Sequence, residues 1–287
     1  MITSISVAVK DLKGKVLLEP HQDISDWARK TVFTSDYQKK KTKFKESSQL
    51  LDDISLIFKK EPYKTILEKW APNFREWLGE IWAPSIVFDE LKAQRLRDPY
   101  GYAHTLTIAV VGSRLLELWV TAAPTVKRSF VGLLLHDLGK TRVGSAILDK
   151  PGELDSLERQ AIHEHPLVGF ALNSAYWGDS NHLCAQVALH HHEDRTGGGY
   201  PRKIKTNSLI LDILAIVDRF DALISERPFR YKKHTVREAF DILKKDTDDG
   251  RYEPDVLKAL IALVRREKIS DRKKMKLGTI GRPPKAT

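Results

Sequence analysis

The sequence predicts a mainly α-helical protein, in which a helical bundle domain follows a small N-terminal module containing a short β-hairpin and helices. Strand-like alternation of apolar side chains is confined to the first 20 residues, whereas helical spacing dominates from about residue 50 onward. Glycines and prolines separate the helical segments. With 287 residues, 41% of them hydrophobic, the chain is long and apolar enough to bury a substantial core.

The N-terminal module begins with the predicted hairpin. Apolar side chains alternate along residues 5–9, Lys13-Gly14 supplies a turn, and residues 16–18 form the returning strand. A polar, lysine-rich stretch then extends to about Ser47. Helical spacing follows at Leu50, Leu51, Ile54 and Ile57, and then at Ile66, Trp70, Phe74, Trp77 and Ile81. We expect the tryptophans Trp70, Trp77 and Trp82 to pack against the helical domain.

From about Ser85 onward, nearly every segment is typical of a helix. The predicted helices span residues 86–97, 101–120, 124–137, 155–176, 181–193, 207–226, 235–246 and 253–267. One of them starts with a capping box, Thr235 to Glu238, in front of an apolar run. We therefore divide the chain into an N-terminal module of unknown role (1–85), a helical domain (86–268) and a basic, flexible tail (269–287).

The charge of the chain is unevenly distributed. The formal net charge is +10, and from Arg265 to the end nine lysines and arginines face two acids. A solvated tail explains this better than nucleic-acid binding does. No apolar run reaches the roughly 18–20 residues of a membrane span, and the first residues lack the pattern of a signal peptide. The single cysteine, Cys184, favours the reducing cytoplasm.

Histidines and acids recur at or beside the ends of the predicted helices. They are His104, His136-Asp137, His165, His191-His192 and Asp218. Imidazole and carboxylate together suit metals such as manganese, iron and zinc. Seven candidate ligands exceed the needs of one tetrahedral ion and suit a pair of ions that acts on a phosphate ester. The apolar run 131–135 buries the His-Asp pair, and a buried aspartate needs a partner or a metal.

Several motifs in this region resemble those of the HD-GYP family of metal-dependent phosphohydrolases, with order and spacing that agree over residues 100–265. They are His136-Asp-Leu-Gly-Lys140, Ile147-Leu-Asp-Lys-Pro-Gly152, His165-Pro-Leu-Val-Gly169, His191-His-Glu193 with Gly199-Tyr-Pro201, and Asp218-Arg-Phe-Asp-Ala-Leu223 with Arg227-Pro-Phe-Arg230. The resemblance implies an HD-type helical bundle.

The resemblance also implies two divalent metal ions, with iron or manganese expected. The ligands carried over are His104, His136, Asp137, His165, His191, His192 and Asp218, with Asp137 as the bridge. Some family members hold a third ion through a glutamate four residues before the first histidine. Here that position is Tyr100, so a binuclear site is expected.

The activity implied is hydrolysis of cyclic di-GMP to linear pGpG, with GMP after a second cut, by a hydroxide that the two metals activate. Lys140 would offset charge on the phosphate. Asp221 would position the attacking water or act as a base, or alternatively orient a histidine. The other expected substrate contacts are Lys150, Tyr200, Arg227 and Arg230. Lys150 could instead only shape a turn, and the two arginines could be ordinary surface charge.

Thr196 departs from the family pattern, which has aspartate at this position of the loop before Gly199-Tyr-Pro201. Threonine fixes a turn less well than aspartate, so the loop, not the metal ligands, is affected. Two alternatives to the enzyme stay open. One is a catalytically weak cyclic di-GMP sensor, or a protein that docks GGDEF-domain partners through this loop. The other is an HD phosphohydrolase for another nucleotide or cyclic dinucleotide. The sequence leaves the oligomeric state open.

Overall fold

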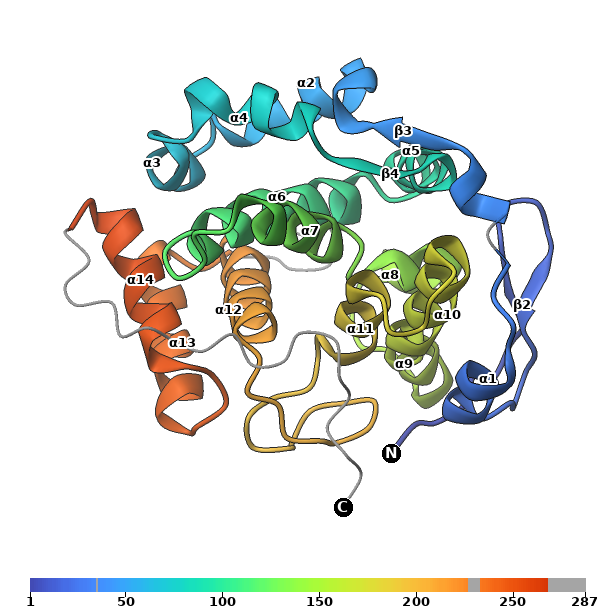
Figure 1. Cartoon of the computed structure of the whole chain (residues 1–287). Helices are drawn as coiled ribbons and strands as arrows, with labels where there is room; N and C mark the ends of the chain where they lie inside the picture. Colours follow the sequence, from blue (N-terminus) through green and yellow to red (C-terminus); the bar gives the residue numbers. More distant parts are fainter. Residues whose placement is uncertain (35, 227–232, 268–287) are drawn as a thin grey trace.

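The computed structural model describes residues 1–34, 36–226 and 233–267, and its architecture is mainly helical (Figure 1). The predicted substrate contacts Arg227 and Arg230 and the basic tail 269–287 lie outside the described residues. Among the described residues, no helix combines the length and the apolar character needed to cross a membrane.

The N-terminal part contains two small antiparallel sheets and short helices. Its elements are β1 (Val9–Lys10), β2 (Val16–Leu18), α1 (Ile24–Lys30), η1 (Asp36–Lys39), β3 (Lys41–Lys43), η2 (Phe44–Glu46), α2 (Ser48–Ile57), α3 (Tyr63–Leu67), α4 (Ala71–Gly79) and β4 (Trp82–Pro84). The predicted hairpin is confirmed, with Val9 opposite Leu18. The pairing of β3 with β4 was not predicted, because a lysine-rich strand shows no apolar alternation.

The helical part follows the predicted segments closely. Its elements are α5 (Ser85–Arg97), α6 (Pro99–Leu116), α7 (Ala123–Leu134), η3 (Leu138–Arg142), α8 (Ser145–Leu148), α9 (Ser156–His163), α10 (His165–Trp177), α11 (Leu183–His190), α12 (Leu209–Ile224), α13 (Val236–Asp248) and α14 (Pro254–Arg265). The capping box of Thr235 and Glu238 at the start of α13 is confirmed.

Two predicted helices are wrong in their extent. The segment 124–137 stops being helical at Leu134, so the His-Asp pair follows α7 and does not belong to it. The segment 155–176 is two helices, α9 and α10. Pro166 explains this second break, because proline has no N–H to donate to the carbonyl of Ile162, four residues earlier. The Nδ1 of His165 contacts that carbonyl oxygen instead, at 2.5 Å.

The centre of the molecule is α6, which packs against α7, α12 and α5 (Figure 1). A second group forms where α10 packs against α11 and η3. The N-terminal part wraps around both groups: the hairpin lies against α10, and α2 and α3 lie against α6. The apolar core is continuous from Ile5 to Leu260. We retain residue 85 as the proposed boundary of the N-terminal module.

The tryptophans of the N-terminal part pack as predicted. The ring of Trp77 meets that of Phe130 edge to face at 5.5 Å, and Trp82 lies 5.8 Å from Trp177. Nε1 of Trp70 donates a hydrogen bond to Glu117 at 3.1 Å. These contacts join the module to α7, to α10 and to the residue that follows α6.

Candidate metal centre

Three candidate ligands stand one or two residues after the ends of α7, α9 and α11, and each places Nδ1 against the carbonyl oxygen three residues earlier. The distances are 2.7 Å from His136 to Leu133, 2.5 Å from His165 to Ile162 and 2.8 Å from His191 to Ala188. A carbonyl oxygen only accepts, so Nδ1 carries the proton in each ring. These carbonyls belong to the last turns of helices, where they lack intrahelical partners. The helix ends therefore orient the rings and leave each Nε2 with a free lone pair.

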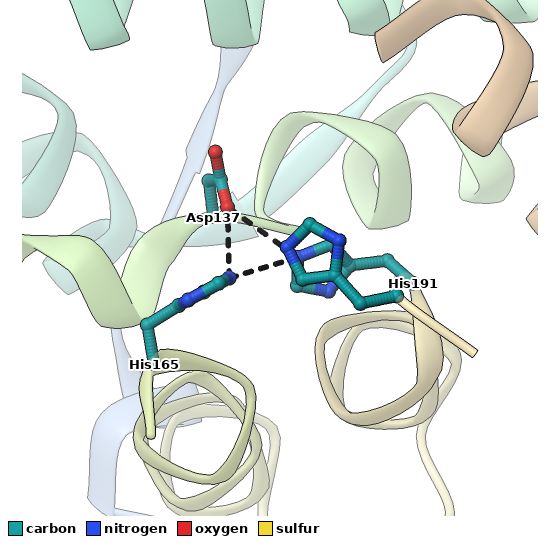
Figure 2. A group of neighbouring side chains, drawn as sticks. Asp137, His165 and His191 are labelled. Carbon is teal, nitrogen blue, oxygen red and sulfur yellow. Dashed lines mark hydrogen bonds and ion pairs between the residues drawn. The ribbon is translucent and has the colours of Figure 1, made fainter. Parts of the chain in front are cut away.

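Asp137 lies where these rings converge (Figure 2). Its Oδ1 is 3.2 Å from Nε2 of His165 and 3.4 Å from Nε2 of His191, and the two Nε2 atoms are 2.9 Å apart. With both Nδ1 atoms protonated and both rings neutral, no proton remains between these three atoms. Their lone pairs face one another, an arrangement that a bound cation stabilises.

The candidate ligands form two groups that share Asp137. One group is Asp137, His165, His191 and His192, and the other is His104, His136 and Asp137. Within each group the ligand atoms lie within 4.8 Å of one another. The second oxygen of Asp137, Oδ2, is 3.4 Å from Nε2 of His136. A carboxylate common to two groups is the arrangement that a bridging ligand between two ions needs.

The orphaned polar atoms of this region test whether a metal fits. Nε2 of His136, Nε2 of His192 and Oδ1 of Asp137 are buried and have no hydrogen-bond partner in the described part of the chain. Leaving such an atom unpaired costs about 1–3 kcal/mol. Metal ligation satisfies all three atoms, and imidazole with carboxylate is a donor set for borderline divalent metals. The residues present therefore fit a metal.

His104, on α6, is held between two carboxylates of α12. Its Nε2 is 2.9 Å from Oδ1 of Asp218, and its Nδ1 is 2.5 Å from Oδ2 of Asp221. Oδ1 of Asp221 accepts hydrogen bonds from the hydroxyls of Tyr63 and Ser225. Asp218 lines the pocket described below, and Asp221 does not. Of the two predicted roles for Asp221, this geometry favours orientation of a histidine over contact with the attacking water.

The electrostatics keep most of the imidazoles neutral, as metal ligation requires. Burial lowers the pKa of His165 to about 4 and holds that of His192 well below its ordinary value. Burial opposes ionisation of Asp137, but the charge of Lys140 and the contacts with His136 and His165 together outweigh burial and hold the pKa of Asp137 well below its usual range. Burial also opposes protonation of His104, yet hydrogen bonds to its two aspartates raise its pKa to about 10.

Comparison with known families agrees with this donor set. The family model described as "HD domain" matches residues 93–256, more than half of the chain. The chain belongs to the HD domain family. The matched region begins in α5 and ends in α14, so it includes every candidate ligand.

Three relatives of this HD domain are named for cyclic dinucleotides. A cyclic di-GMP phosphodiesterase of Thermotoga maritima is 32% identical over 219 residues, 72% of this chain and 58% of that protein. One of Pseudomonas aeruginosa is 31% identical, over 63% of this chain and 46% of that protein. A 3′3′-cGAMP-specific phosphodiesterase of Vibrio cholerae is 36% identical, over 53% and 33%. The chain spans about half the length of the first two relatives and a third of that of the Vibrio cholerae protein. The relatives and the HD domain match bear out the resemblance to the HD-GYP family.

The candidate metal centre opens into a pocket of about 430 Å³. The candidate ligands that line it are His104, Asp137, His191, His192 and Asp218. Lys140 lines it too, and its Nζ donates to Oδ2 of Asp137 at 2.6 Å. Tyr100, also in the lining, stacks on His104 with ring centroids 6.2 Å apart. The pocket therefore offers a cation and aromatic faces beside the ligand groups.

Not every predicted substrate contact lines this pocket. Lys150 is not brought to the pocket: its ammonium pairs with Glu158 at 2.5 Å. Sequence reasoning missed two cations in the lining, Arg219 and Arg251. Arg219 directly follows Asp218 on the same predicted helix, and this position was the only sign in the sequence that Arg219 could lie near the site. Arg251 lies far along the chain, and no motif marks it.

The loop that carries Gly199-Tyr-Pro201 packs against one side of the candidate metal centre. The ring of Tyr200 lies between His192 and His163, stacked on each with ring centroids 4.4 Å apart. A side-chain carbon on Gly199 would lie 2.2 Å from the carbonyl oxygen of His192, so only glycine permits this approach. Tyr200 lines the pocket, and its role as a substrate contact stays a prediction.

Thr196 takes part in fixing this loop. Its hydroxyl accepts from the N–H of Gly198 at 3.1 Å and donates to Asp194 at 2.7 Å. Asp194 also accepts from the N–H groups of Thr196 and Gly198. The turn that aspartate would form at position 196 is thus built by threonine together with Asp194.

Glu193 also holds the loop. Its carboxylate accepts from the N–H of Arg202 at 2.6 Å and from that of Ile204 at 2.9 Å. These contacts are with the backbone of the loop that follows.

Proposed function

We propose that this HD domain binds two divalent metal ions through His104, His136, Asp137, His165, His191, His192 and Asp218. The observation that carries the proposal is the convergence of unprotonated Nε2 atoms on Asp137, which belongs to both ligand groups. Iron or manganese suits this set of imidazoles and carboxylates.

The proposed reaction is hydrolysis of a phosphodiester of cyclic di-GMP to give linear pGpG, with GMP after a second cut. A pair of divalent ions polarises the phosphoryl oxygens and lowers the pKa of water. Lys140 lines the pocket beside Asp137, where its ammonium offsets the charge that develops on the phosphate. Asp221 keeps His104 in place.

The pocket supplies further substrate contacts. We assign phosphate contacts to Arg219 and Arg251, because guanidinium groups suit phosphate oxygens. Arg219 is held by Asp246 at 3.1 Å, and Arg251 by Asp194 at 3.2 Å. We assign stacking on a guanine base to the pocket face of Tyr100. Arg227 and Arg230 keep their predicted role as further phosphate contacts.

The choice of substrate draws on the relatives. Two are named for cyclic di-GMP and one for 3′3′-cGAMP, which differs from it in one base. The assay that tests the proposal incubates anaerobically purified protein, loaded with Fe²⁺ or Mn²⁺, with each cyclic dinucleotide. Chromatography then measures the loss of the cyclic compound and the appearance of the linear one.

We expect cyclic di-GMP to be linearised at the greater kcat/KM. A reversed order would reassign the substrate to 3′3′-cGAMP and keep the reaction. Tight binding of cyclic di-GMP without turnover by the metal-loaded protein would support the sensor alternative and overturn the enzyme. Docking of GGDEF-domain proteins and a cytoplasmic location stay predictions.

A further inference from the structure

A buried side chain of the N-terminal module contacts Asp221, the partner of the candidate ligand His104. Tyr63, the first residue of α3, is 1% exposed, and its hydroxyl donates a hydrogen bond to Oδ1 of Asp221. The two residues are 158 positions apart in the sequence. α3 packs against α6, the helix of His104, and against α14.

Asp221 connects this tyrosine to a candidate ligand. Its Oδ1 accepts from Tyr63 and, at 3.0 Å, from the hydroxyl of Ser225, while its Oδ2 faces Nδ1 of His104. The side chains of His104 and Asp221 are 5% and 4% exposed. At this burial, bulk solvent does not reach these contacts, so the two hydroxyls fix the carboxylate and the carboxylate fixes the ring.

We propose that Tyr63 is a positioning residue of the metal centre, through which the N-terminal module holds Asp221 and thereby His104 in the geometry that binds metal. The proposal rests on the proposed function, because it takes His104 as a ligand. It gives residues 1–85 a role, namely completion of the hydrogen-bonded shell around a site whose ligands all lie beyond residue 100.

The physical reason is the dependence of a histidine ligand on the partner of its second nitrogen. A carboxylate at Nδ1 fixes the tautomer and the ring orientation and makes Nε2 a stronger donor to metal. Asp221 serves in this way only while its own orientation is fixed. Removal of the Tyr63 hydroxyl leaves Oδ1 with Ser225 alone and frees the carboxylate to rotate away from His104.

Measuring metal affinity tests the positioning role of Tyr63 directly and does not require an activity assay. Metal-free full-length protein is titrated with Mn²⁺ in competition with a chromophoric chelator, and the Kd and the number of bound ions are determined. Removal of such an outer partner typically weakens metal binding roughly 10- to 100-fold. We expect Tyr63→Phe to show a loss of this size in one of the two ions.

Tyr102→Phe is the matched control. Tyr102 is also a buried tyrosine between α6 and the N-terminal part, and its hydroxyl donates to a carboxylate, Asp53, at 3.0 Å. In the described part of the chain, the side chain of Asp53 contacts Gln49, Arg95 and Tyr102, and none of these is a candidate ligand. Tyr102→Phe should therefore bind Mn²⁺ like the unaltered protein, while the unfolding midpoints of the two metal-free variants stay similar.

The outcomes separate this proposal from the proposed function. If the unaltered protein binds no Mn²⁺, the proposed metal centre is refuted, and so is the positioning role of Tyr63. If the unaltered protein and Tyr63→Phe bind two ions with the same affinity, only the role of Tyr63 is overturned. An equal loss in Tyr102→Phe also overturns it, because the effect would then be a general loosening of the interface.

A second variant covers the case in which Tyr63→Phe fails to fold. Ser225→Ala removes the other hydroxyl on Oδ1 of Asp221 and changes no residue of the N-terminal module. It should weaken the same ion by a smaller factor, because the tyrosine remains. Unchanged Mn²⁺ affinity in Ser225→Ala would contradict the dependence of His104 on a fixed Asp221.

Discussion

Nζ of Lys140 lies 2.6 Å from Oδ2 of Asp137, the carboxylate that belongs to both groups of candidate ligands. The lysine sits one turn of η3 beyond the aspartate and borders the pocket. Its ammonium is thus placed where a phosphate bound to the centre would carry its charge. In the proposed function, this pair joins the metal ligands to the contact with substrate.

Replacing Lys140 should separate these two functions. Lys140→Met removes the charge and keeps most of the side-chain volume. Loss of one preorganised donor to a developing anion costs about 100-fold or more in kcat. We expect a fall of this order in turnover of cyclic di-GMP with two metal ions still bound, measured by metal analysis of the same sample. Full turnover would exclude Lys140 from the reaction.

His190 and His192, the two histidines that flank His191, provide a matched pair. His192 belongs to a ligand group, whereas His190 does not, and its Nδ1 contacts the carbonyl oxygen of Gln186 at 3.0 Å. His192→Ala should lose at least one metal ion and most activity. His190→Leu, which fills a similar volume, should keep both ions. Equal metal content in the two variants would show that His192 is not a ligand.

The hydroxyl of Thr196 should matter for the loop and not for the metals. Thr196→Val removes two hydrogen bonds, each worth about 1 kcal/mol, and should raise KM for cyclic di-GMP several-fold with little change in metal content. Thr196→Ser keeps the hydroxyl and should restore KM. If both variants have the KM of the unaltered protein, the hydroxyl does not order the loop.

His182 should make the metal-free protein less stable in acid. Burial lowers the pKa of His182 to about 4 from an ordinary value of 6.5, so the unfolded chain binds the proton more tightly than the folded one. Its contribution to stability is therefore present above pH 6.5 and is lost as the pH falls toward 4. The neutral ring also caps α11 by accepting from the N–H of Cys184 at 3.3 Å.

His182→Asn retains a capping side chain and removes this titration. Between pH 7 and pH 5, the free energy of unfolding should fall by about 1–2 kcal/mol more in the unaltered protein than in the variant. Urea denaturation of both metal-free proteins at the two pH values measures the difference. Parallel pH dependences would contradict a neutral, buried His182.

Local signals were enough to predict most helices and the candidate ligands. Helical spacing identified α5 to α7 and α11 to α14 and merged α9 and α10 into one segment, whereas α8 was not predicted. Every candidate ligand except His104 stands in one of the motifs. The helix break at His165 was missed because it depends on Pro166 and on a side-chain contact that replaces the missing N–H. Tyr63 could not be found, because its partner Asp221 is brought to it only by tertiary packing.

The same limit applies to charged side chains. Lys150 stands in a family motif, yet its position beside Glu158 depends on how α9 begins, where Glu158 also completes a capping box with Asp155. Arg251 follows α13 and reaches the pocket through the packing of α13 and α14. Neither position follows from a pattern in the sequence. Motifs indicate which residue types are present, and the fold decides which of them meet.

The most direct test of a metal-dependent phosphodiesterase centred on Asp137 is turnover of cyclic di-GMP as a function of metal ions bound per chain. Mn²⁺ or anaerobic Fe²⁺ is added stepwise to metal-free protein, and bound metal and pGpG formation are measured on each sample. We predict no pGpG without metal, full turnover near two ions per chain, and neither full loading nor turnover in Asp137→Ala. Full turnover by the metal-free protein or by Asp137→Ala, or intact cyclic di-GMP at two ions per chain, would contradict it.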